Sequence, residues 1–403
     1  MAFSASINGL MAAQQDMGVI SNNIANVGTV GFKRSDTLFS EIYTAAVGPA
    51  EADGSSDGVL TRVRSDFGQG GFEFTSSPLD LAIDGQGLFV LRNGQETSYT
   101  RAGAFRLDSN GFIVTEGGAN VQGFAADAEG QISGALSDLQ IGAALLEQKT
   151  TENINIGGNL DSRASAPSTT PFDPANPESY SFSAATTIFD STGTARQVSL
   201  FFVKNDIAPG QFTLSARVDD ALQPESVLLE FTATGEIDPA SDSELVLASY
   251  QQAEGAAPPV TIDLSNLTSF GVTSSVSSIT QDGFPAGELT GFAFDKSGIA
   301  YASYTNNEVR AVGQIALATF RNTQGLESNG KTTFTESATS GLAEIGKPDA
   351  GVRGFIRPNA LESANVDLTV ELLALIEAQR SFQSIAQAIQ NENEASDALL
   401  QLR

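Results

Sequence analysis

The chain has 403 residues, of which 41% are hydrophobic and 17% are charged, and 48 acidic against 21 basic residues give a net charge of −27. Binding of nucleic acid or anionic lipid depends on Lys and Arg neutralising phosphates, so this charge disfavours both partners. Cys and His are absent, which excludes disulfides, the usual zinc sites, a thiolate nucleophile and an imidazole base. We therefore expect no catalytic, cofactor-binding or metal-binding residues.

The N-terminal segment has small or apolar residues at alternating steps of three and four, a spacing that predicts a helix with a coiled-coil seam. These positions are Phe3, Ser6, Leu10, Ala13, Met17, Ile20, Ile24 and Val27. The first basic residue is Lys33, and polar residues interrupt the stretch 1–20, so we expect no cleaved signal peptide. No run of about 18 apolar residues occurs, so no membrane span is predicted. Gly28 and Gly31 flank β-branched residues and predict the end of the helix.

The middle of the chain predicts antiparallel β-structure. Asp and Gly stand at the first and fourth positions of three short segments, 108–111, 190–193 and 295–298. This is the signature of a type I turn, often closing a hairpin with a bulge. Apolar or alternating runs flank the segments, as in a protein built of short strands.

Changes in composition suggest domain boundaries. Residues 48–58 are polar and contain Gly, residues 164–177 form a Pro/Ser/Thr loop, and residues 253–260 contain Gly and Pro. The end segments share one kind of pattern, so we expect the β-segments next to them to associate as well. The block between these two β-segments is then an insertion. This nested domain arrangement is a hypothesis, and it is based on the similar residue spacing at the two ends of the chain.

Two motifs could indicate an enzyme, and neither has the context that its chemistry needs. Gly325–Thr332 satisfies the phosphate-loop pattern, but the residues after Thr332 are β-branched or small and polar, which predicts a strand or loop rather than the required helix. Asp80 and Asp84 could form a glycosidase pair. With 48 acidic residues some pairs are always close, and nothing else near these two resembles a sugar site. A P-loop nucleotide-binding protein is the alternative to a non-enzymatic chain.

The C-terminal segment repeats the seam of the N-terminal one. Its positions are Leu368, Leu372, Leu375, Phe382, Ala386, Ile389 and Leu400. Two such ends predict helices that pair with each other or with the ends of neighbouring copies, which indicates assembly rather than catalysis.

Both termini resemble bacterial flagellar rod and hook proteins. The resemblance is carried by the stretches Ser21–Lys33, Ser363–Leu368 and Ala378–Gln383, with further similarity in Leu79–Val90 and Tyr99–Phe105. The signature positions are Asn22, Asn23, Ala25, Asn26, Thr29, Gly31, Phe32, Lys33, Asn365, Val366, Asp367, Ala378, Gln379 and Arg380. The length, the central block and the stretch 313–326 are most similar to hook members of the family, and a distal rod subunit is the alternative.

The resemblance implies a structural subunit of the hook, a curved, flexible tube outside the cell that passes motor torque from rod to filament. It further implies export through the flagellar type III apparatus without a cleaved signal peptide. The implied partners are other hook subunits, the distal rod protein, the hook cap, the hook–filament junction protein and the hook-length ruler. A short coiled pair is marginal in water, so we expect the end segments to order only on assembly.

Together these observations predict an α+β multidomain protein, in which paired N- and C-terminal coiled-coil helices flank nested, mainly antiparallel β domains. The predicted parts are a helical inner-tube domain (1–30 with 365–403), an extended connector (31–69 with 358–364), an inner β domain (70–145 with 285–357) and an inserted outer β domain (146–284). The residues predicted to form the assembly interface are Leu10, Met17, Ile20, Ile24, Leu368, Leu372, Leu375, Phe382 and Ile389.

Overall fold

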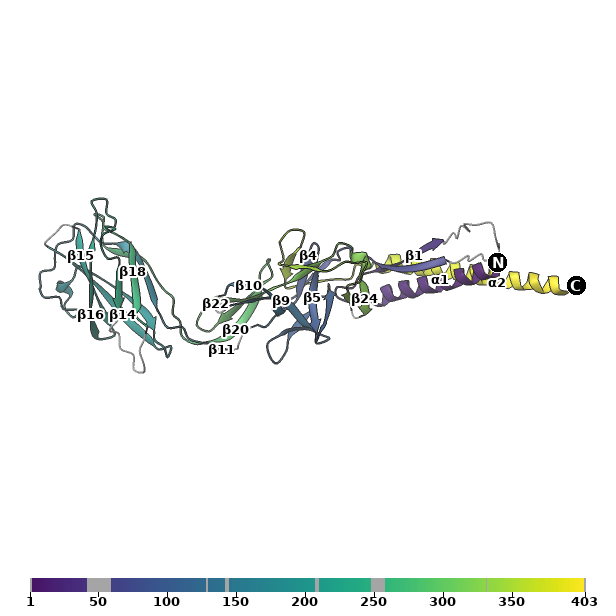
Figure 1. Cartoon of the computed structure of the whole chain (residues 1–403), viewed down its shortest axis with the longest axis horizontal. Helices are drawn as coiled ribbons and strands as arrows, with labels where there is room; N and C mark the ends of the chain where they lie inside the picture. Colours follow the sequence, from purple (N-terminus) through teal and green to yellow (C-terminus); the bar gives the residue numbers. More distant parts are fainter. Residues whose placement is uncertain are drawn as a thin grey trace. The chain divides into compact units, whose positions relative to one another are not determined.

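The structure is a computed structural model that describes residues 2–41, 59–127, 130–141, 145–206, 210–247, 258–330 and 332–401. Their contacts divide them into two compact units (Figure 1). The first unit comprises the described residues within 1–142, 291–302 and 309–403, and the second those within 143–290 and 303–308. The predicted boundary at 48–58, and most of the one at 253–260, lie outside the described residues.

Two long helices lie in the first unit, α1 (Ala2–Ala25) and α2 (Leu368–Gln401) (Figure 1). The Asp367 side chain caps α2 by accepting from the backbone N–H of Thr369 at 2.8 Å, which satisfies a donor that the helix leaves free. The helices contact each other in antiparallel orientation. A Cβ on Gly9 would lie 3.7 Å from Ile385, and the Asn23 amide donates to Glu371 at 3.2 Å.

The segment predicted to be an extended connector contains paired strands. β1 (Ser35–Glu41) and β2 (Val59–Ser65) form an antiparallel pair from Ser35 opposite Ser65 to Glu41 opposite Val59. β28 (Ala360–Glu362), at the other end of the chain, pairs with β3 (Phe72–Phe74). An isolated pair of strands is marginal in water, and here the first pair lies against α1.

The sheet of the first unit brings together distant parts of the chain. Its central strands are in the order β22-β9-β5-β6-β25-β24. Their bounds are β22 (Val309–Ile315), β9 (Asn120–Ala126), β5 (Leu88–Asn93), β6 (Glu96–Thr100), β25 (Thr333–Thr335) and β24 (Glu327–Gly330). The other strands of this unit are β4 (Leu81–Asp84), β7 (Phe105–Leu107), β8 (Ile113–Thr115), β10 (Ile132–Asp138), β23 (Leu317–Thr319), β26 (Glu344–Gly346) and β27 (Phe355–Pro358), with β21 (Ile299–Tyr304) beginning here and a 3₁₀ turn η2 (Thr323–Gly325). The sheet packs a core that includes Leu88, Val90 and Phe334.

The second unit contains two four-stranded sheets around one core. One sheet is antiparallel throughout, in the order β13 (Phe182–Phe189), β14 (Ala195–Lys204), β15 (Gln211–Val218) and β16 (Ala221–Glu230). The other has the order β17 (Glu244–Leu247), β18 (Val260–Thr268), β12 (Asn153–Asn159) and β19 (Ser275–Gln281). Short elements complete the unit: β11 (Leu145–Leu146), the 3₁₀ turn η1 (Pro177–Ser179) and the start of β20 (Gly287–Phe294).

The alternation of buried and partly exposed residues along its strands explains the core of the second unit. Every second residue of β15 is buried, namely Phe212, Leu214, Ala216 and Val218, as expected for a strand with one face on a core. The β12–β18 pair is parallel and is an exception to the predicted antiparallel arrangement. Parallel neighbours need a long crossover, and about a hundred residues separate these two strands in sequence. The fold is otherwise mainly antiparallel, as predicted.

The three predicted Asp–Gly turns are confirmed. The Gly N–H donates to the Asp carbonyl at 3.1 Å in 108–111, 2.9 Å in 190–193 and 3.0 Å in 295–298. Each Gly has a positive φ, between 73° and 81°, which L-residues rarely adopt. Each Asp carboxylate also accepts from the N–H four residues on, at 2.8, 2.9 and 2.8 Å. Aspartate therefore stabilises these hairpins through its side chain as well as its backbone.

The phosphate-loop lookalike lies in a hairpin. β24 pairs with β25 across it, from Glu327 opposite Thr335, and Lys331 lies outside the described residues. The prediction that a strand or loop comes after Thr332 is confirmed, because β25 starts at Thr333. The motif is therefore succeeded by a strand and not by a helix whose N-terminus could face a phosphate.

Asp190 is the most enclosed of the three turn aspartates, with only 3% of its surface exposed. Burial acts to raise the pKa of its carboxyl. Hydrogen bonds from Thr192, Thr194 and Arg196 outweigh that effect and hold the pKa below 3.8. Arg196 also contacts Asp219, whose side chain is 46% exposed.

Replacing Asp190 by Asn should destabilise the second unit by about 1–3 kcal/mol, because buried donors lose a charged acceptor. Asp219→Asn is the matched control, since it touches the same arginine from a solvated position and should cost less than about 1 kcal/mol. Urea unfolding of the full chain, followed by circular dichroism, measures both. Equal losses in the two variants would contradict the argument.

Candidate functional site

The predicted interface residues differ in how far a single chain covers them. On α1, Ile20 is buried and lies against residues of α2, and Leu10, Met17 and Ile24 are half-buried. On α2 the half-buried positions are Leu375, Phe382 and Ile389, at helical spacing from the buried Ala378. These residues are therefore largely covered within one chain.

Leu368 and Leu372 are instead exposed, at 44% each. Together with Leu373 (60% exposed) and Ile376 (47% exposed) they form what we call the exposed stripe of α2. Positions 368, 372 and 376 are four residues apart and share one face of a helix. Contiguous large apolar side chains in water are typical of surfaces that take part in protein interactions. Leu373 and Ile376 lie outside the predicted seam, although the apolar run from 372 to 376 indicates an apolar face broader than one seam.

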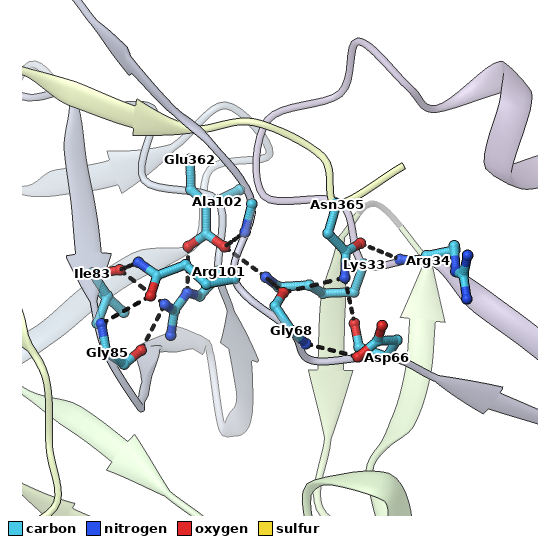
Figure 2. A network of polar contacts seen from close by, with 12 residues as sticks. Lys33, Arg34, Asp66, Gly68, Ile83, Gly85, Arg101, Ala102, Glu362 and Asn365 are labelled. Atoms are coloured by element: carbon cyan, nitrogen blue, oxygen red, sulfur yellow. Dashed lines mark hydrogen bonds and ion pairs between the residues drawn. The ribbon is translucent and has the colours of Figure 1, made fainter. Parts of the chain in front are cut away.

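A buried ion cluster connects the start of α2 with the N-terminal segment and the sheet. We call it the ionic joint, and it consists of Lys33, Arg101 and Glu362 (Figure 2). The Lys33 Nζ lies 2.6 Å from Glu362 Oε1, and the Arg101 Nε lies 2.5 Å from Glu362 Oε2. Lys33 is 4% exposed, Arg101 5% and Glu362 0%. A charge is tolerated at such depth only when it is paired and hydrogen-bonded.

The remaining hydrogen-bonding capacity of the ionic joint is used by backbone groups. The Gly70 N–H donates to Glu362 Oε1 at 2.9 Å. The Arg101 guanidinium donates to the carbonyls of Gly85 at 2.7 Å and Ile83 at 2.8 Å (Figure 2). Lys33 Nζ donates to the Gly68 carbonyl at 2.7 Å. The joint thereby fixes two loops as well as three side chains.

The ionic joint contains two cations and one anion. Burial lowers the pKa of Lys33 from its usual 10.5, and the nearby Arg101 adds to this effect, while Glu362 and Asp66 oppose it. The net result is a lowered pKa because desolvation is the largest of these effects.

Two asparagines hold the neighbouring backbone. The Asn23 amide donates to the Ser35 carbonyl at 2.8 Å and accepts from the Ser35 N–H at 3.0 Å, as a paired strand would. Asn365 accepts from the Arg34 N–H at 2.7 Å and donates to the Asp66 carbonyl at 2.9 Å (Figure 2). The start of β1, the end of β2 and both helices are thus connected through side-chain amides.

Gly31 is required by close packing. Its φ is 67°, its N–H donates to the Glu362 carbonyl at 2.7 Å, and a Cβ there would lie 2.3 Å from the Ala102 nitrogen. Any larger residue would therefore displace the chain where Lys33 enters the ionic joint.

The other signature residues have varied positions. Asn26 donates to the Asn22 carbonyl at 2.9 Å and accepts from the Thr29 hydroxyl at 3.1 Å, which closes the end of α1. Asp367 caps α2, and Ala378 is buried against α1. Phe32 and Val366 are half-buried, whereas Ala25, Gln379 and Arg380 are exposed. The structure thus brings Asn23, Lys33 and Asn365 into one network and leaves Gln379 and Arg380 in solvent.

Arg101, Glu362 and Glu371 are functional candidates that the sequence analysis did not assign. Glu362 is 329 residues from Lys33 and 261 from Arg101, so no local spacing could connect them. The available signal was a single acid in the short apolar strand β28, a position where an unpaired charge would be costly.

Four family models match successive parts of the chain. They are described as Flagella basal body rod protein (residues 3–33), Flagellar hook protein FlgE/F/G D1 domain (82–160), Flagellar basal body protein FlaE D2 domain (159–284) and Flagellar basal body rod FlgEFG protein C-terminal (357–402). The architecture and these matches define a structural protein of the bacterial flagellar axis.

Curated relatives are similar over the full length. The chain is 33% identical to the flagellar hook protein FlgE of Escherichia coli (strain K12) over 420 residues, covering 100% of both chains. It is 30% identical to that of Borreliella burgdorferi, covering 98% of both. The flagellar hook protein FlgE2 of Helicobacter pylori shares the fold, with a TM-score of 0.57 and 14% identity over 72% of this chain and 100% of that one. The chain belongs to the flagellar hook protein family.

Among the helices that the structure describes, none combines the length and the hydropathy needed to cross a lipid bilayer.

Replacing Glu362 by Gln should destabilise the first unit by about 3–5 kcal/mol, because two buried cations would then face each other without an anion. Lys33→Met should cost less, since it leaves an intact Arg101–Glu362 pair. Urea unfolding of the full-length protein gives both values. A smaller loss for Glu362→Gln than for Lys33→Met would contradict the assignment of Glu362 as the centre of the joint.

The lowered pKa of Lys33 predicts a pH dependence of stability. Between that lowered pKa and 10.5 the unfolded chain binds more protons than the folded one, so this lysine makes the free energy of unfolding rise with pH in that window. Lys33→Met should remove the rise. Urea midpoints across an alkaline pH series, compared between wild type and variant, test it. Identical pH profiles would contradict the prediction.

Proposed function

We propose that this chain is the structural subunit of a flagellar hook and that copies polymerise through the exposed stripe of α2 into a curved tube that transmits torque. The observation that carries the proposal is the stripe itself: Leu372, Leu373 and Ile376 are 44%, 60% and 47% exposed on a helix whose opposite face already contacts α1. The contact between α1 and α2 does not involve this second apolar face of α2, so we expect another molecule to cover it.

The paired helices would form the inner wall of the tube as a coiled coil. Supporting this, α1 and α2 contact each other in antiparallel orientation, and both helices carry half-buried residues at seam spacing. In this arrangement Leu10, Met17, Ile20, Ile24, Leu375, Phe382 and Ile389 hold the pair together, and Leu368 and Leu372 reach a neighbouring copy. That the end helices are ordered only in the polymer stays a prediction.

The ionic joint would carry mechanical load between the helices and the sheet of the first unit. Glu362 lies six residues before α2 begins, and its carboxylate holds Lys33 from the N-terminal segment and Arg101 after β6. Separating these groups would expose unpaired charges in a dry interior, which is strongly unfavourable. A twist applied to the helices therefore passes to the sheet rather than loosening the connection.

The proposed partners are those that the same role requires. They are other copies of the chain, the distal rod protein at one end, and the hook cap or the hook–filament junction protein at the other. The hook-length ruler and the type III export apparatus would act during assembly. A chain without Cys can pass through an export channel without a cross-link hindering it. Full-length similarity to hook proteins disfavours the distal rod alternative.

Leu372→Asp with Ile376→Asp should abolish polymerisation, because two charges would enter an apolar contact that stabilises each subunit by about 1.5–3 kcal/mol per buried side chain. Both side chains are exposed in the single chain, so its folding should be unchanged. The matched control is Ser384→Asp with Gln387→Asp, which adds the same two charges at exposed polar positions of the same helix. Sedimentation and electron microscopy of concentrated protein give the readout. Normal tubes from the double variant would disprove the assembly role of the stripe.

A further inference from the structure

A hollow lies beside the ionic joint in the first unit, with a volume of about 620 Å³. Its lining comes from the end of β2, the loops 66–69 and 85–88, and the segment 318–324. Lys33, Gly68, Gly85 and Arg101, which Figure 2 shows around the joint, contribute to its wall. We call it the basic hollow.

The charge of the basic hollow is opposite to that of the chain. Its lining includes Lys33, Arg64, Arg101 and Arg321 but only one acid, Asp66. Glu362 beneath the wall offsets one of the two joint cations, so the joint keeps one positive charge. The protein as a whole has a net charge of −27. A positive concavity in such a chain attracts anions that the rest of the surface repels.

The two arginines at the rim are not committed to structural ion pairs. Asp36, the cross-strand partner of Arg64, is paired with Arg34 at 3.0 Å, and within the described residues Arg64 itself has no carboxylate within 4.0 Å. The Arg321 side chain is 88% exposed, and its contact with Glu344 is 3.7 Å long at the surface. An exposed pair of this kind is worth little, so both guanidinium groups can take another carboxylate.

The walls add the apolar component of a protein-binding site. Phe67 packs on Phe334 with ring centroids 4.9 Å apart, and Phe320 packs on Tyr99 at 4.8 Å. Phe67 and Phe320 are both half-buried and both line the hollow. Aromatic residues and arginine are the types enriched at protein interfaces and their energetic centres.

We propose that the basic hollow receives a carboxylate-bearing surface of a second copy of this chain, an inference that rests on the proposed function. Two copies with −27 each repel one another unless opposite charges meet where they touch. Every copy carries 48 acidic residues, so its surface supplies carboxylates, and the planar fork of arginine binds a carboxylate through two hydrogen bonds. The buried cations Lys33 and Arg101 contribute to the positive electrostatic potential of the hollow. Arg64 and Arg321 make the direct contact with the carboxylate of the second copy.

Reversing the rim charge tests this directly. Arg64→Glu with Arg321→Glu should raise the protein concentration needed for polymerisation at least about tenfold, because attraction becomes repulsion at the contact. Arg64→Gln with Arg321→Gln should raise it less. Neither change touches the ionic joint, so the temperature of thermal unfolding of the single chain should not change.

The control is Arg106→Glu with Lys296→Glu, which makes the same change in net charge at two exposed positions of the first unit. If both charge-reversed proteins polymerise at the wild-type concentration, or if both are impaired equally, the hollow has no specific role and the proposal is overturned. A wild-type protein that forms no polymer at all would refute the proposed function instead.

A cross-linking experiment identifies the occupant. The chain contains no Cys, so Gln324→Cys, at an exposed position lining the hollow, can be labelled uniquely with a benzophenone maleimide. Irradiated polymers should yield adducts between two copies, mapped by mass spectrometry to a segment containing Asp or Glu. Adducts confined to one chain in polymers that have formed normally would contradict occupation by a second copy.

Discussion

The first unit depends on one buried carboxylate. Glu362 holds Lys33 at 2.6 Å and Arg101 at 2.5 Å where none of the three side chains is more than a few per cent exposed. Each cation comes from a different part of the chain, and each also donates to loop carbonyls. A desolvated charge is costly when it is unpaired. The segments that carry Lys33, Arg101 and Glu362 are therefore expected to pack together cooperatively. The joint therefore specifies how the terminal segments meet the sheet more than it adds net stability.

This arrangement separates two mechanical tasks. The ionic joint and the amide contacts of Asn23 and Asn365 fix the base of the helices to the sheet. In the proposed assembly, the exposed stripe of α2 forms an apolar contact and the basic hollow forms an electrostatic contact with neighbouring copies. An apolar contact tolerates sliding because it is not directional, whereas a charge contact sets which surfaces meet. A tube that bends while it rotates needs both properties, and in the proposed assembly they come from different surfaces of the subunit.

Local structures and the contact between the two terminal helices were predictable from the sequence, whereas the individual side-chain contacts between distant residues were not. The Asp–Gly turns at 108, 190 and 295 were predictable because a turn is decided within four residues. A strand or loop after Thr332 was predictable from the β-branched and small polar composition, and the structure has a strand there. The interface residues were predicted as one set, yet Ile20 is buried and Phe382 half-buried in the single chain, while Leu368 and Leu372 are exposed. Helical periodicity shows that a face is apolar, but it does not show what covers that face.

The sequence by itself predicted assembly rather than catalysis, because Cys and His are absent and both ends carry apolar residues at helical spacing. The terminal signatures then indicated the flagellar axis. Only the tertiary structure decided that Lys33, Arg101 and Glu362 form one cluster, and that a chain with a charge of −27 contains a positive hollow. The physical reason is distance along the chain. Turns and helices depend on neighbours a few residues apart, whereas the joint links residues separated by 261 and 329 positions. Such pairs become visible only when the chain has folded.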